Sequence, residues 1–290
     1  MKQGIIASSR VKYCAEFITY NNAVLAAGGE LSQSQKSAIN TFIIGLKNAG
    51  LWSDIIAFYP FLSADSQTLA AENTHKINMK NPGTFNLTYL GGSLPANHYS
   101  TYFLTNTTQV CDTGINASTS ISADNNTIGA KAIGASSGPI IAVKASAATS
   151  STTPTFGLHN YMVIGGSVYK PGLQSYSYLY QGTGNLVLGT SAGGTAYGIG
   201  SFAGVRRAVN NASVYRNGAN VNNNTIARTI APPAYNLYIG GYNNGSAGTF
   251  TGNTAGKAVC NIWLASRGFS DAEITTYQGL EDTFNTATGR

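Results

Sequence analysis

The stretch that decides the fold is CNIWLASRGFSDAEI, residues 260–274. Its first part is an apolar run of strand length, broken by a single polar residue. In its second part Ser270 stands three residues before Glu273, which is the spacing of a helix capping box. The stretch therefore predicts a buried strand over residues 258–265 that leads into a short C-terminal helix.

Upstream, short runs rich in Val, Ile, Tyr, Phe and Thr alternate with turns rich in Gly, Asn, Ser and Pro. This texture is typical of a mainly β chain whose antiparallel strands form a sandwich or barrel. Asn217-Gly218 is the strongest hairpin signal, because both residues tolerate the positive φ angles of a type I′ turn. The predicted strands exceed what one sheet holds, so two packed sheets are expected. They are residues 55–61, 85–89, 100–104, 126–132, 140–145, 156–160, 168–170, 175–180, 185–188, 196–201, 205–209, 212–216, 219–221, 236–239 and 258–265.

The first fifty residues differ from the rest. Ser32 and Gln35 form a second capping box ahead of apolar residues at helical spacing, and Gly50 follows where a left-handed cap would fall. An earlier helix is predicted over residues 14–27. We therefore divide the chain into a helical N-terminal attachment segment, residues 1–52, and a β-sandwich domain, residues 53–290.

Composition narrows the class of protein. The 290 residues are 43% hydrophobic but only 10% charged. Coiled coils and charged disordered tails need more Glu, Lys and Arg, so both are excluded. No run has the length of a membrane span, and the start lacks the apolar region of a signal peptide, so membrane insertion is not expected.

Charge is unevenly distributed along the chain. Residues 125–270 contain nine Lys or Arg and no Asp or Glu, and the formal net charge is +6. Glycosidic hydrolysis usually takes a carboxylate pair and a calcium cage several carboxylates, so this region supplies neither by itself. The scattered cations favour an acidic partner subunit or an anionic bacterial surface. They form no basic stripe, so nucleic acid is not an expected partner.

Cysteine and histidine give no sign of a metal or cofactor. Cys14, Cys111 and Cys260 fit neither a disulfide framework nor a zinc pattern, and we interpret them as buried free thiols. The histidines have no nucleophile context or metal-ligand spacing, so we interpret them as isolated. They are His75, His98 and His159.

Four motifs near the C-terminus occur in the order found in a known superfamily. They are YRNGANV (215–221), NLYIGGY (236–242), GTFTG (248–252) and the 260–274 stretch. Together they resemble the closing strands of laminin G-like, concanavalin A-like lectin/glucanase domains. The resemblance implies a two-sheet antiparallel jelly-roll sandwich, here with a small helical N-terminal segment and a short C-terminal helix.

The front of the domain resembles a second group. GLWSDIIAFYPFL (50–62) and HKINMKNP (75–82) are similar to the lead-in of structural proteins from tailed bacteriophages of Bacteroidetes hosts that carry this lectin-like domain. The resemblance implies a virion protein that is assembled in the host cytoplasm and becomes extracellular on lysis. Its partners would be other virion proteins.

Two features of the superfamily are missing. Members that hydrolyse glucans carry a Glu-x-Asp-x-x-Glu strand, which this sequence lacks, so we expect no enzyme activity. Calcium-dependent members use acidic ligands near the sheet edge, and only Asp112 and Asp124 are candidates. We interpret both as loop carboxylates beside a turn, so no metal is expected.

Two sets of residues are candidates for sugar binding. Tyr176, Tyr178 and Tyr180 alternate along one predicted strand and could stack on pyranose rings, although half-buried core tyrosines are the ordinary alternative. The second set, Tyr242, Asn243 and Asn244, is predicted to form a loop, with a plain turn as its alternative.

Three functions follow from these patterns. The first is a virion structural protein, a fibre or projecting subunit, that displays the sandwich to attach to host-surface glycan. The second is an architectural head decoration or fibre protein that binds no sugar. The third, a glycan-acting enzyme, is disfavoured by the missing carboxylates. A dimer or trimer is expected, because a displayed module gains avidity from repetition.

Overall fold

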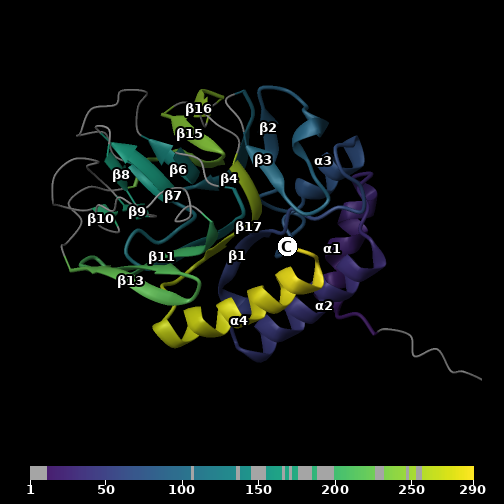
Figure 1. Cartoon of the computed structure of the whole chain (residues 1–290), viewed down its shortest axis with the longest axis horizontal. Helices are drawn as coiled ribbons and strands as arrows, with labels where there is room; N and C mark the ends of the chain where they lie inside the picture. Colours follow the sequence, from purple (N-terminus) through teal and green to yellow (C-terminus); the bar gives the residue numbers. More distant parts are fainter. Residues whose placement is uncertain are drawn as a thin grey trace, which may run out of the picture.

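The computed structural model describes residues 12–105, 108–134, 138–144, 155–164, 167–169, 172–175, 185–187, 199–225, 232–245, 248–252 and 257–290. These residues form three layers (Figure 1). A ten-stranded sheet packs on a seven-stranded sheet, and helices cover the outer face of the second. The prediction of a mainly β, two-sheet sandwich with a C-terminal helix is confirmed.

The seven-stranded sheet lies in the middle layer. Its order is β1 (Ile55–Tyr59), β17 (Lys257–Ala265), β5 (Asn126–Ala132), β11 (Gly200–Ala208), β12 (Asn211–Arg216) and β13 (Ala219–Asn224), with β3 (Phe103–Thr105) paired to β17. The predicted strand at 258–265 is therefore β17, a central strand. Its position explains why the run is apolar on both faces.

The ten-stranded sheet forms the other side of the sandwich. Its order is β10 (Asn185–Val187), β9 (Gly172–Ser175), β7 (Thr155–Ile164), β6 (Gly138–Lys144), β14 (Asn236–Ile239), β4 (Val110–Asn116) and β2 (Thr88–Leu90), with β8 (Ser167–Tyr169), β15 (Gly241–Asn244) and β16 (Phe250–Gly252) beside it. Strand pairs in the described residues are antiparallel except β15 with β6, which is parallel.

The predicted hairpin joins β12 to β13. Asn217 and Gly218 have φ angles of 49° and 76°, as a type I′ turn requires. A side chain on Gly218 would also approach Gln278 of the C-terminal helix at 3.1 Å, so the turn is fitted against that helix.

The helices are α1 (Ala15–Ala26), α2 (Gln33–Asn48), α3 (Leu69–His75) and α4 (Asp271–Ala287), with 3₁₀ turns η1 (Trp52–Asp54) and η2 (Pro95–Asn97). Both predicted capping boxes are present, at Ser32 and at Ser270. Gly50 has the expected left-handed φ of 73°. Helix α3 was not predicted, because its seven residues are too short to show a periodic pattern.

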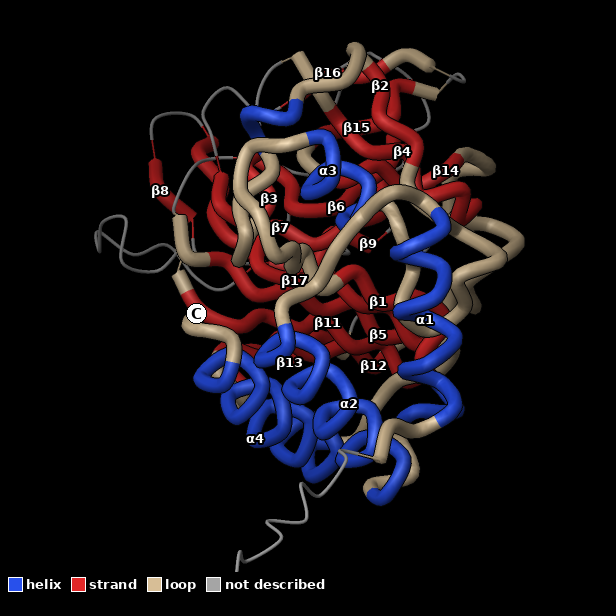
Figure 2. Tube along the Cα trace, turned by 90° about the vertical axis from the view of Figure 1, so that its right-hand side faces the viewer, coloured by secondary structure: helices blue, strands red, loops and turns tan. Residues whose placement is uncertain are grey.

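Two hydrophobic cores hold the layers together. One lies between the two sheets, and the other lies between the seven-stranded sheet and helices α1, α2 and α4 (Figure 2). In the second core Phe42 of α2 stacks on Phe284 of α4 at 4.7 Å, and Tyr277 of α4 stacks on Trp263 at 4.1 Å. The predicted domain boundary at residue 52 stays a prediction.

Several strand boundaries differ from the predictions. Strand β1 ends at Tyr59, since Phe61 has a positive φ of 43°, and Phe85 at 57° delays the start of β2 to Thr88. Residues 200–201 and 205–208, from two predicted strands, lie in one strand, β11, and residues 196–198 lie outside the described residues. Strand β4 was missed. The C-terminal part of the predicted strand 175–180 lies outside the described residues.

The three cysteines are free, as predicted, and Cys111 and Cys260 are fully buried whereas Cys14 is half-buried. In the part of the chain that the structure describes, we find no helix with the length and apolar character to cross a membrane.

Candidate functional site

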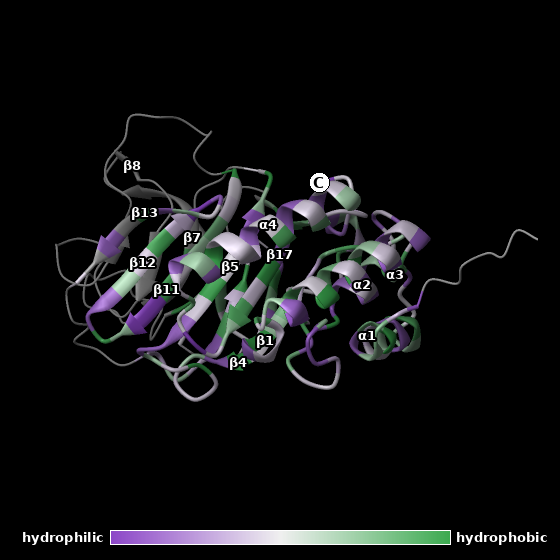
Figure 3. Cartoon of the chain, turned by 90° about the horizontal axis from the view of Figure 1, so that it is seen from below, coloured by the Kyte–Doolittle hydropathy of each residue, from purple (hydrophilic) through white to green (hydrophobic). Residues whose placement is uncertain are grey.

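A polar pocket lies where the start of α4 meets the seven-stranded sheet. Strands β12 and β13 extend past the first turn of α4 (Figure 3). The pocket has a volume of about 490 Å³. The residues that line it all have polar or charged side chains: Arg207, Asn210, Asn211, Ser213, Asn220, Asn223, Thr225 and Asp271.

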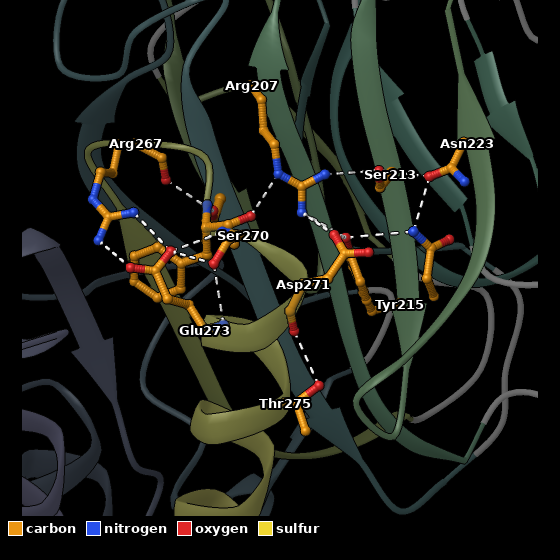
Figure 4. Close-up of polar contacts among 12 residues, drawn as sticks. Arg207, Ser213, Tyr215, Asn223, Arg267, Ser270, Asp271, Glu273 and Thr275 are labelled. Carbon is orange, nitrogen blue, oxygen red and sulfur yellow. Dashed lines mark hydrogen bonds and ion pairs between the residues drawn. The ribbon is translucent and has the colours of Figure 1, made fainter. Parts of the chain in front are cut away.

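The guanidinium of Arg207 organises the floor of the pocket (Figure 4). Its Nε donates to the Phe269 carbonyl at 2.8 Å and its Nη1 to the Ser213 hydroxyl at 3.0 Å. Its Nη2 donates to Asp271 Oδ1 at 2.8 Å, and the Tyr215 hydroxyl donates to the same oxygen at 2.6 Å. The strand β11 is thereby tied to the first residue of α4.

Strand register brings the remaining polar groups to the same face. Ser213 pairs with Asn223, and Tyr215 with Asn220, across β12 and β13. Ser213 and Tyr215 share a face because side chains alternate along β12, and a register shift in the pairing with β13 brings both Asn220 and Asn223 to that face. Asn223 Oδ1 accepts from the Ser213 hydroxyl at 2.7 Å and from Asn220 Nδ2 at 2.9 Å.

The two charged groups of the pocket, Arg207 and Asp271, neutralise each other. The hydrogen bond from Tyr215 lowers the pKa of Asp271, and the nearby charge of Arg207 lowers it further. Burial raises the pKa of the Tyr215 hydroxyl. Near neutral pH the pocket therefore holds one carboxylate and one guanidinium, paired with each other, beside neutral amides and hydroxyls.

A second ion cluster fixes the start of α4 and therefore the position of Asp271. Arg267 donates to both carboxylate oxygens of Glu273, at 2.9 and 2.7 Å, and to Asp54 Oδ2 at 2.9 Å. The bidentate bond to Arg267 lowers the pKa of Glu273 to about 2. Glu273 also accepts from the Ser270 backbone, which completes the capping box.

The rim of the pocket has amides that the fold does not use. Asn210 lies in the turn between β11 and β12, Asn211 is the first residue of β12, and both are exposed. Neither side chain has a hydrogen-bond partner among the described residues. Each amide offers two donors and an acceptor, so the rim can bind a ligand rich in hydroxyl groups.

The structure does not test the first predicted sugar site. Tyr176, Tyr178 and Tyr180 lie outside the described residues. Their role as a stacking platform stays a prediction.

The second predicted site does not form the expected loop. Tyr242, Asn243 and Asn244 lie in β15, which pairs with both β16 and β6. Asn243 is 2% exposed, donates to the Asn236 carbonyl at 3.1 Å and accepts from the Gly245 backbone at 3.1 Å. The prediction of a loop was wrong because this Asn-rich segment pairs with strands on both sides, and the sugar-binding role of the three residues stays a prediction.

Two histidines interpreted as isolated are in fact paired. His75 Nδ1 and His98 Nδ1 lie 3.0 Å apart, and both residues are buried. Their separation of 23 residues follows no helical or strand period, so the sequence gives no sign of the contact. Among the described residues no group of three His, Cys, Asp or Glu side chains is placed to bind a metal.

Asp112 also differs from its interpretation as a loop carboxylate, because it lies in β4. Its Oδ1 accepts from the Gly114 backbone at 2.8 Å and from Asn236 Nδ2 at 3.0 Å. The polar pocket itself was missed. The local sequence feature that bears on this pocket is the Asn217-Gly218 hairpin, which sets the register between β12 and β13.

Comparison with known proteins gives structural likeness only. No family model and no curated protein matches the chain. A Trypanosoma rangeli sialidase mutant with trans-sialidase activity is 14% identical, with a TM-score of 0.47 over 86% of this chain and 39% of that one. The botulinum neurotoxin serotype D binding domain is 11% identical, with a TM-score of 0.46 over 80% of this chain and 52% of that one.

A third solved structure is matched over nearly its whole length. Domain 4 of an extracellular GH43 arabinanase from Geobacillus stearothermophilus, solved with arabinotriose, is 11% identical, with a TM-score of 0.43 over 78% of this chain and 98% of that one. The chain spans about half or less of the sialidase and toxin chains. These scores carry no argument about function, which must come from the residues of this chain.

Proposed function

We propose that this chain is a structural protein of a bacteriophage virion that displays its β-sandwich to bind glycan on the host surface. The polar pocket beside α4 is the observation that carries the binding part of this proposal. It joins the amides of Asn210 and Asn211 at the rim to a floor in which Arg207 and Asp271 neutralise each other.

The chemistry of the pocket suits sugar hydroxyl groups. Carbohydrate hydroxyls both donate and accept, and side-chain amides do the same in a fixed plane. Asn210 and Asn211 supply such amides, and the bonds of Ser213 and Asn220 to Asn223 hold the neighbouring polar groups in place. Tyr176, Tyr178 and Tyr180 stay candidates for a further stacking surface.

The virion part of the proposal is supported by the resemblance of residues 50–62 and 75–82 to phage structural proteins. Residues 1–52 would attach the sandwich to other virion proteins, as a dimer or trimer. The alternative is an architectural subunit that binds no sugar. The two proposed functions differ only in whether the polar pocket binds a ligand.

A glycan array tests the binding part directly. The purified chain is compared with the Asn210→Ala/Asn211→Ala variant and with Asn48→Ala, which removes an exposed amide at the end of α2 as a matched control. Loss of two hydrogen bonds at about 0.5–1.5 kcal/mol each should weaken binding by about 5-fold to about 150-fold. The control should bind like the parent chain.

The outcomes separate the candidates. Binding by the parent chain that the double variant loses supports the pocket. Binding that the variant retains moves the site elsewhere and directs attention to Tyr176, Tyr178 and Tyr180. Absence of binding to any host glycan favours the architectural alternative. Mass spectrometry and cryo-EM of purified particles test the virion assignment, and a chain absent from particles would refute it.

A further inference from the structure

Three polar residues lie in one row across the centre of the seven-stranded sheet. Lys131 of β5 is the register partner of Ser201 on β11 and of Asn261 on β17. Facing residues on adjacent antiparallel strands have Cβ atoms about 4.5–5.5 Å apart. The row therefore brings an amine, a hydroxyl and a carboxamide side by side.

The row faces helix α4, on the side of the second core. Asn261 shares its strand face with Trp263, which stacks on Tyr277 of α4 at 4.1 Å. Ser201 donates a short hydrogen bond to Glu281 Oε2 of the same helix. Glu281 thus lies over the row, between the strands and the helix.

Three of the four groups at this site are buried. Asn261 is 0% exposed, Glu281 1% and Ser201 4%, while Lys131 is half-buried. Neither polar atom of the Asn261 side chain has a hydrogen bond of good geometry to any described residue. A fully buried amide without partners is costly, and such orphan groups in native structures mark strain, missing ligands or chemistry.

The carboxyl of Glu281 is suited to move a proton. Burial raises its pKa, against the opposing effects of the Ser201 hydroxyl, the Lys131 charge and the Asn261 amide. The neutral amine of Lys131 is a nucleophile, and the Glu281 carboxyl over the row can take up and return a proton.

We propose that Lys131 and Asn261 form an intramolecular isopeptide bond with Glu281 as the proton-transferring residue. The Nζ of neutral Lys131 adds to Cγ of Asn261 while the protonated Glu281 polarises the amide oxygen. The Cγ–Nδ2 bond then breaks, and the proton lost by the attacking nitrogen reaches Nδ2 through Glu281. One ammonia leaves, Glu281 is regenerated, and no oxidant or reductant is needed.

The bond would join two central strands that are far apart in sequence. Strand β17 contributes side chains to both hydrophobic cores, and β5 contributes to the core between the sheets. A covalent link between them closes the chain over residues 131–261 and resists separation of β17 and α4 from the rest of the sheet. This inference does not depend on glycan binding.

Intact-mass spectrometry of the purified full chain is the first test. The expected mass is about 17 Da below that of the unmodified sequence, the mass of one ammonia. Tryptic digestion should give one branched peptide that contains Lys131 and Asn261, with no cleavage after Lys131. Cyclisation at Asn217-Gly218 or Asn244-Gly245 also releases ammonia, but hydroxylamine cleaves its product and leaves an isopeptide bond intact.

Three variants test which residues form the bond and which residue transfers the proton. Glu281→Gln keeps a side chain that can bond to Ser201 but removes the proton carrier, so the full mass should return. Lys131→Arg should also have the full mass, and Lys36→Arg on α2 should keep the loss. Circular dichroism checks that each variant is folded, and Lys131→Arg serves as the test if Glu281→Gln does not fold.

Two results would overturn the proposal. One is a parent chain of full mass whose Asn261 peptide is entirely linear. The other is a mass loss that persists in Lys131→Arg.

Discussion

Lowering the pH from 7 to 5 is expected to destabilise this chain through the buried pair His75 and His98. Their Nδ1 atoms share one hydrogen bond at 3.0 Å, and the rings of Phe61, Tyr89 and Phe103 surround them. Neither Nε2 has a hydrogen-bond partner among the described residues. A proton added to this pair would place an imidazolium in an apolar environment.

The groups around the pair also oppose protonation. Burial lowers the pKa of His98 to about 3, and the charge of Lys76 on α3 acts in the same direction. Burial lowers the pKa of His75 well below its ordinary value, with smaller contributions from His98 and Arg290, against a Tyr99 backbone hydrogen bond that raises it. Both histidines therefore stay neutral in the native state at pH 5.

The free energy of unfolding falls with pH because the native and unfolded chains bind different numbers of protons. The unfolded chain has histidine pKa values near 6.5, so it takes up two more protons than the native chain as the pH falls below that value. The free energy of unfolding then decreases, by about 2 kcal/mol per histidine between pH 7 and pH 5, or about 4 kcal/mol for the pair. Above pH 7 the contribution is constant.

Urea unfolding at pH 7, 6 and 5 measures this loss, with fluorescence of the buried Trp52 and Trp263 as the signal. His98→Gln should lose about half as much stability over the same range, because one titrating group remains in the core. A parent chain that loses less than about 1 kcal/mol would refute the assignment of two neutral native histidines. Keeping the pH at 5 or above avoids protonation of Glu273, whose pKa is about 2.

Two further predictions concern stability at pH 7 and are read from the same urea curves. A Cβ at Gly129 would lie 2.1 Å from the indole of Trp263, so Gly129→Ala should lower the free energy of unfolding by about 1–3 kcal/mol. Gly279 lies in the middle of α4 with open space around it, so Gly279→Ala should raise the free energy of unfolding by about 0.5–1 kcal/mol. Ser32→Ala removes the capping hydroxyl that accepts from the Gln35 backbone and should cost about 1 kcal/mol. Equal effects of the two glycine variants, or no effect of the cap variant, would contradict these contacts.

Local signals were enough to predict the main elements. The capping boxes at Ser32 and Ser270 fix helix starts through bonds within three residues, and Asn217-Gly218 fixes a hairpin through two φ angles. The sandwich could be predicted because many short strand-forming runs separated by turn residues most often fold as two sheets packed face to face. Each of these depends on neighbours in sequence.

What could not be predicted depends on register between distant strands. Between Val259 and Asn261 the pairing of β17 with β5 shifts by one residue, and this irregularity puts Asn261 opposite Lys131. No pattern within either strand signals it. The same holds for His75 and His98, and for β4, whose Asp112 and Gly114 are poor strand formers that pairing with β14 and β2 overrides.

The absence of carboxylates from residues 125–270 acquires a different meaning in the structure. We expected the cations of that region to favour an acidic partner, but α4 supplies acidic residues within the chain. Asp271 pairs with Arg207, Glu273 with Arg267, and Glu281 lies over the row that contains Lys131. The last strand and the helix that follows it thus complete the polar pocket and the buried row together. Because both sites draw on the same helix, a change that displaces α4 should affect both at once, whereas Asn210→Ala/Asn211→Ala and Lys131→Arg should each affect one.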